Sequence, residues 1–71
     1  MTKQERDMVY SMSDEQLLDA IVRQGEKVDK VRGYKSGMRR KEFKELFEFT
    51  GRDNMIGMFI QTQVQFGFKE V

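Results

Sequence analysis

The chain contains no cysteine, no histidine and no proline. Without cysteine it has neither a disulfide framework nor a thiolate metal site, so cysteine usage does not indicate whether its compartment is reducing or oxidising. Without histidine it lacks the commonest general base and the commonest ligand of transition metals. No apolar run approaches the roughly 20 residues of a membrane-spanning helix, and the N-terminal segment MTKQERDM is too charged for a signal peptide. We therefore expect a cytoplasmic protein with no membrane segment and no cofactor.

Carboxylates and glycines remain as candidates for chemistry, and neither forms a catalytic pattern. The six glycines match neither G-x-G-x-x-G nor the P-loop. Paired carboxylates such as Glu42 and Glu45 stand beside lysines, which is typical of a solvated, salt-bridged helix face. Asp53 and Asn54 lack further oxygen ligands at the spacing of a calcium loop. We therefore predict neither an enzyme nor a metal site.

A length of 71 residues allows one small domain, covering 1-71. A chain of this size buries only about 60% of the surface that it exposes when unfolded, so its core is thin. A homodimer is therefore an alternative to a monomer. We expect residues 1-12 to form an arm or a short helix. Residues 13-71 should form a helical core of three main helices.

Local patterns predict a mainly α fold. The sequences T-x-x-E at residues 2-5 and S-x-x-Q at residues 13-16 are capping boxes, and each marks a helix start. The second of these helices runs from Asp14 to Gln24 if Gly25 ends it. If Gly25 is tolerated, the apolar stripe extends the helix to about Arg32.

The stretch 36-68 holds most of the aromatic and aliphatic bulk, and it reads as helix, tight turn, helix. A serine at its start can cap a helix from Gly37 to Thr50, and Gly51 stands where helices commonly end in the left-handed conformation. Asp53 is the next N-cap candidate, and a helix from Asn54 to Phe66 gathers its apolar residues on one half of the wheel, with Gln63 on the wrong side. The expected core is Leu18, Ile21, Phe43, Leu46, Phe47, Ile56, Phe59 and Ile60.

The end of the same stretch also alternates between apolar and polar residues, from Ile60 to Lys69. This is the period of a strand, so an α+β fold with a C-terminal strand at about 59-69 is the alternative. Against it, no other segment alternates cleanly enough to provide a partner strand.

Positive charge is concentrated in the middle of the chain. The net charge is only +1, but residues 23-41 hold eight basic and two acidic residues, a local charge of +6. The segments before and after carry −3 and −2. Arg39, Arg40 and Lys41 fall in the first turn of an expected helix, where the helix dipole disfavours cations. Such a basic helix start suits a phosphate oxygen.

The helix pair at 37-66 resembles a helix-turn-helix, whose second helix lies in the major groove of DNA. The resemblance implies that Arg52, Asn54, Met58 and Gln61 reach base edges, and amide side chains are suitable readers of adenine. We therefore predict a small nucleic-acid-binding regulatory protein whose partner is duplex DNA. Its expected contacts are Arg32, Lys35, Arg39, Arg40, Lys41, Arg52, Asn54 and Gln61.

The alternative is a small inhibitor or adaptor, of a kind that phages or mobile elements carry, which binds an acidic protein surface. The chain has six methionines, and exposed methionines form adaptable contact surfaces. The basic segment would then steer the protein toward its partner.

Overall fold

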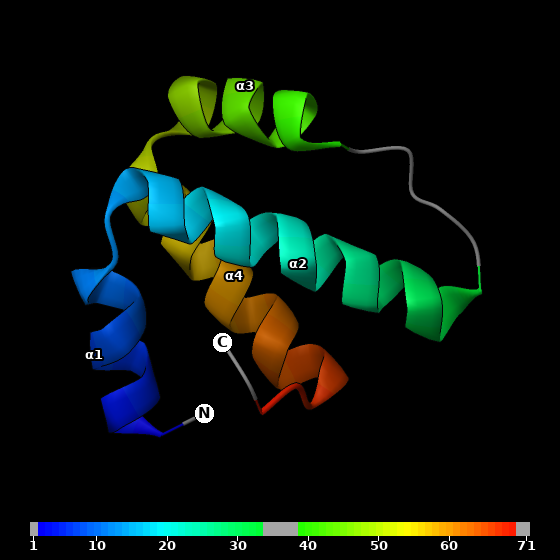
Figure 1. Cartoon of the computed structure of the whole chain (residues 1–71). Coiled ribbons are helices and arrows are strands. Elements are labelled where there is room, and N and C mark those ends of the chain that lie inside the picture. The colour runs from blue at the N-terminus through cyan, green and yellow to red at the C-terminus, as the bar shows by residue number, and fades with distance from the viewer. Residues whose placement is uncertain (1, 34–38, 70–71) are drawn as a thin grey trace.

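The computed structural model describes residues 2–33 and 39–69, and Figure 1 shows how their helices are arranged. The helices are α1 (Lys3–Ser11), α2 (Asp14–Arg32), α3 (Arg40–Thr50) and α4 (Arg52–Phe66). The predicted mainly α fold is confirmed. The alternative strand at about 59-69 is wrong, since the described residues contain no strand. Helical winding instead places Met55, Phe59 and Gln63, four residues apart, on one buried face of α4.

The predicted capping box is complete at residues 13-16, and at residues 2-5 the hydroxyl half of the predicted pattern is present. The Thr2 hydroxyl accepts a hydrogen bond from the backbone N–H of Glu5 at 3.2 Å. At the start of α2, the Ser13 hydroxyl accepts from the backbone N–H of Gln16 at 3.1 Å, and the Gln16 side chain accepts from the backbone N–H of Ser13 at 3.0 Å. These bonds satisfy amides that a helix start leaves without partners.

The longer of the two predicted versions of α2 is correct. The helix passes through Gly25 and ends at Gly33, whose φ of 80° is left-handed. An added Cβ at Gly25 would lie 3.2 Å from the Phe43 ring of α3. The glycine therefore allows α3 to approach α2 closely.

The predicted start of α3 is wrong. The helix begins at Arg40 because Arg39 is extended, with φ −111° and ψ 176°, and acts as the N-cap. The backbone N–H of Arg39 donates to Glu42 Oε2 at 3.0 Å, which stabilises this later start. The predicted cap Ser36 and the predicted first residue Gly37 lie outside the described residues.

A single residue, Gly51, joins α3 to α4. Its φ of 91° and ψ of 162° belong to a region that is essentially restricted to glycine. The predicted positive φ is confirmed, although the residue is not in the left-handed helical region. The predicted N-cap at Asp53 is wrong, because the chain reverses at Gly51 and α4 starts at Arg52.

The helix α2 lies in the centre of the domain. Figure 1 shows α3 running antiparallel to α2 on one side, while α4 crosses on the other side in the same general direction as α2. The helices α3 and α4 diverge from their junction at Gly51, and α1 packs against α4.

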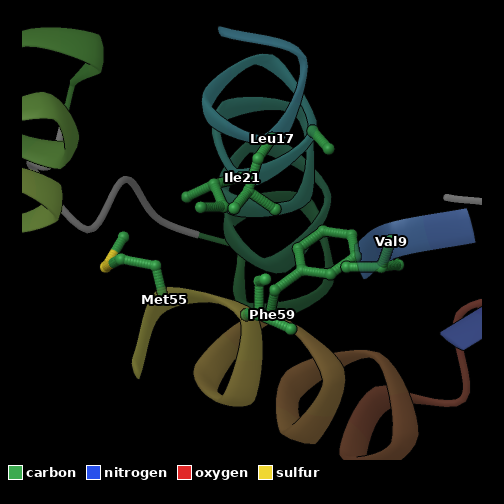
Figure 2. Packing of buried hydrophobic residues seen from close by; sticks show 7 residues of the cluster. Val9, Leu17, Ile21, Met55 and Phe59 are labelled. Carbon is green, nitrogen blue, oxygen red and sulfur yellow. The ribbon is translucent and has the colours of Figure 1, made fainter. Parts of the chain in front are cut away.

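The core joins α1, α2 and α4. Figure 2 shows Val9 of α1 beside the Phe59 ring of α4, Leu17 and Ile21 of α2 above them, and Met55 of α4 at the other end of the cluster. Val9 is 0% exposed, so α1 is a packed helix rather than a loose arm. Of the predicted core, Leu18, Ile21, Ile56 and Phe59 are buried, whereas Phe43, Leu46, Phe47 and Ile60 are only half-buried.

Candidate binding surface

An open apolar groove lies between α2, α3 and α4. Its volume is about 190 Å³, a size that suits a side chain rather than a whole drug-sized ligand. It exists because α3 buries none of its side chains fully and leaves its apolar face partly open. We call it the central groove, and its lining residues are Ile21, Gln24, Gly25, Val28, Asp29, Arg32, Phe43, Leu46, Met55, Met58, Phe59 and Thr62.

Exposed apolar side chains occur within the central groove and elsewhere on α3. Met58 of α4 lines the groove and is 49% exposed. Phe49 of α3 is 89% exposed, and it follows Leu46 by three residues, which places both on neighbouring positions of the helix surface. Water therefore contacts apolar surface that a partner could cover.

Two glutamines connect α2 and α4 beneath the groove. Gln24 Nε2 donates to the Phe59 backbone carbonyl at 2.8 Å and to Gln63 Oε1 at 3.0 Å. Gln24 is 7% exposed and Gln63 is 2% exposed. The position of Gln63 on the apolar side of α4 is thus explained by a buried hydrogen bond.

One predicted nucleic-acid contact, Arg32, belongs to a cluster of cations and aromatic rings at the ends of α2 and α4. The Arg32 guanidinium lies 5.6 Å from the centre of the Phe66 ring, and Lys27 Nζ lies 5.7 Å from the centre of the Phe68 ring. The two rings are stacked with their centres 5.5 Å apart. Arg32 is exposed and also lines the central groove.

The other predicted basic contacts differ in whether their side chains are already paired within the protein. Arg39 and Lys41 are exposed and form no ion pair within the described residues. Arg40 instead pairs with Asp19 and so holds the start of α3 against α2. Lys35 lies outside the described residues.

Arg52 faces the protein rather than solvent. Its guanidinium donates to Asp14 Oδ1 at 2.6 Å, to the Tyr10 carbonyl at 3.0 Å and to the Met12 carbonyl. These acceptors belong to the end of α1, the α1–α2 connection and the start of α2. Arg52 therefore stabilises the junction of three helices, and both terminal nitrogens of its guanidinium are hydrogen-bonded within the protein.

The outer face of α4 is uncharged beyond its first turn. Asn54 Nδ2 donates to the Thr50 carbonyl at 3.0 Å, so this predicted base reader caps the end of α3. Gln61 is exposed, but no cation of α4 lies beside it. The exposed residues of α4 are Asp53, Asn54, Gly57, Met58, Gln61, Val64 and Gln65.

The structure does not bring the predicted contacts of the described residues together in one place. Arg32 lies at the end of α2, and Arg39, Arg40 and Lys41 lie at the start of α3. Arg52 and Asn54 lie at the α3–α4 junction, with Gln61 further along α4, so the predicted contacts are spread over the domain. The joining turn is one residue, shorter than the three to four residues typical of a helix-turn-helix.

Sequence reasoning missed Gln24, Gly25 and Val28 as parts of a site. A signal for them was present, since glutamines at positions 24 and 63 interrupt the apolar faces of two helices. A polar residue on an apolar face indicates a buried partner or a polar point within a binding surface.

Within the described residues no cluster of acidic side chains is placed to hold a metal ion. None of the described helices is both long and apolar enough to cross a bilayer. A comparison of the chain with protein-family models, curated proteins and solved structures finds no match.

Proposed function

We propose that this protein is a small binding module that holds an acidic, amphipathic helix of a protein partner in its central groove. The observation that carries the proposal is the open apolar groove itself, with Arg32 at its rim. Arg39 lies one turn before the groove residue Phe43 and adds a second cation on that side of α3.

The apolar contacts would supply affinity and the cations would supply orientation. Covering an exposed apolar side chain contributes up to about 1.5 to 3 kcal/mol, and Met58 is the exposed anchor in the groove. Charge complementarity at a rim mainly raises the association rate and excludes partners of the wrong sign. An amphipathic helix in an apolar groove is a recurrent mode of this kind of recognition.

The proposal is tested with two synthetic amphipathic peptides that share one apolar face with a central tryptophan. One peptide carries glutamates on its polar face and the other carries lysines. We expect the acidic peptide to shift the backbone amide NMR signals of Gly25, Met58 and Thr62, with an affinity that falls as salt rises. The basic peptide should bind at least tenfold more weakly.

A matched pair of variants locates the binding surface. Met58→Glu places an anion at the mouth of the groove, whereas Met8→Glu makes the same change on α1, where the methionine is 48% exposed instead of 49%. Only Met58→Glu should lower the affinity of the protein for the acidic peptide. Equal effects of the two variants, or shifts confined to α1, would reject the central groove as the binding site.

Nucleic-acid binding is the second candidate, favoured by the cations that form no ion pair within the described residues. The structure makes α4 a poor reader of duplex DNA, because Asp53 stands at its start and Arg52 is paired with Asp14. Binding would therefore use phosphate contacts from Arg32, Arg39 and Lys41.

Titration with duplex DNA at several salt concentrations tests this candidate. Log affinity should fall with log salt by about 0.9 for each phosphate neutralised, and Arg39→Ala should lower that slope by about one. A folded protein that binds no duplex at low salt would eliminate this candidate.

A further inference from the structure

Gln24 presents one unused hydrogen-bonding atom at the floor of the central groove. Its amide nitrogen has two hydrogens, and both are donated, one to the Phe59 carbonyl and one to Gln63 Oε1. A backbone carbonyl can only accept, so the bond to Phe59 determines which end of the Gln24 amide is nitrogen.

The Gln24 carbonyl oxygen accepts no hydrogen bond from the described residues. No described side-chain nitrogen or oxygen is both buried and without a partner, so this oxygen keeps access to solvent. The side chain is nevertheless 7% exposed and lines the central groove. The oxygen therefore belongs to a groove residue and is an acceptor without a protein donor among the described residues.

We propose that Gln24 Oε1 selects a partner whose apolar anchor carries an N–H donor, namely the indole of a tryptophan side chain. This inference rests on the proposed function and specifies the anchor of the partner. A donor at this position would take the place of solvent at the oxygen, while an anchor without a donor would leave the oxygen buried and unpaired.

Tryptophan fits the surroundings of Gln24 better than other donors. Ile21, Phe43, Leu46 and Phe59 offer aliphatic and aromatic surface to a flat ring. Indole has one donor and no acceptor, so a single bond to Gln24 satisfies its polar requirement. An ammonium or an amide would bring additional donors, and the side chains of Ile21, Phe43, Leu46 and Phe59 contain no acceptor for them.

The test uses indole and indene, two bicyclic compounds of nearly the same shape, of which only indole has an N–H. Each is titrated into the full chain, and binding is followed from the amide NMR signals of the central groove. Indole should bind roughly fivefold more tightly, the factor that corresponds to a hydrogen bond of net strength about 1 kcal/mol. Equal affinities would overturn the role of Gln24 while leaving the groove in place.

A double variant provides an independent arm of the test. In Gln24→Met/Gln63→Met both amides are replaced together, so the core keeps unbranched side chains and no glutamine is left unpaired. Indole and indene should then bind equally well, and an indole preference that persists would overturn the inference. If neither compound shifts the groove signals of the wild-type protein, the central groove is not a binding site, and the proposed function fails as well.

Discussion

A double-mutant cycle on Gln24 and Gln63 measures the hydrogen bond that joins α2 to α4. Gln63→Met removes the acceptor and leaves one Gln24 hydrogen without a partner, while Gln24→Met removes the donor and deprives Gln63 Oε1 of its bond. Both side chains are at least nine-tenths buried, so neither recovers a full hydrogen bond to water. Each single variant should lower the free energy of unfolding by about 1 to 3 kcal/mol.

The double variant should be much less destabilised than the two singles combined. Replacing both partners by apolar groups of similar shape removes the paired donor and acceptor together. We therefore expect a coupling energy of about 1 to 2 kcal/mol between Gln24 and Gln63. Urea denaturation followed by far-UV circular dichroism measures all four proteins, and equal m-values would show that the unfolded states are comparable.

Two outcomes would refute this reasoning. Additive effects, within about 0.5 kcal/mol, would show that Gln24 and Gln63 are not bonded in solution. A cost below about 0.5 kcal/mol for Gln63→Met would show that water reaches the site, which contradicts its burial.

Three further substitutions test other parts of the structure by the same denaturation assay. Arg52→Ala should cost about 1.5 to 3 kcal/mol because it removes charge-assisted bonds to two carbonyls, whereas Asp14→Ala, which removes only the exposed ion pair, should cost less than about 1 kcal/mol. Equal costs would contradict the junction role of Arg52. Leu46→Ala should cost about 1 to 2 kcal/mol, less than the 2 to 5 of a fully buried leucine, and a larger loss would place Leu46 in the core. Gly25→Ala should change stability by less than about 1 kcal/mol, since the gain in helix propensity offsets a 3.2 Å contact with Phe43. The same variant should weaken indene binding by narrowing the groove, and an unchanged affinity would contradict the position of that groove wall.

Much of the secondary structure follows from the sequence because its signals act within four residues. The cap at residues 13-16 forms both predicted bonds, the cap at residues 2-5 forms one of them, and Gly51 separates two helices as expected. Periodicity also identified the buried faces of α2 and α4 through Leu18, Ile21, Ile56 and Phe59. These features depend on local hydrogen bonds and on which side of a helix avoids water.

The open alternatives and the errors lie where two local readings competed. Apolar alternation between Ile60 and Lys69 suited a strand, and only the burial of Met55, Phe59 and Gln63 against α2 selects the helix. Asp53 was a reasonable cap, but the one-residue reversal at Gly51 starts α4 before it. Each choice is made by contacts with another helix, which a local pattern does not contain.

The use of individual polar side chains was decided by the tertiary structure alone. The basic character of Arg52 and the amides of Gln24 and Gln63 are plain in the sequence, but their partners are 35 to 42 residues away. The predicted DNA-contacting role of Arg52 and Asn54 remains a prediction, and in the structure both side chains bind backbone carbonyls. The helices α3 and α4 diverge from Gly51 on either side of α2. This divergence leaves the central groove open, with Phe43 and Leu46 of α3 and Met58 of α4 along it. Helix directions of this kind are determined by packing between distant segments, so composition and periodicity could predict the helices but not the surface they leave open.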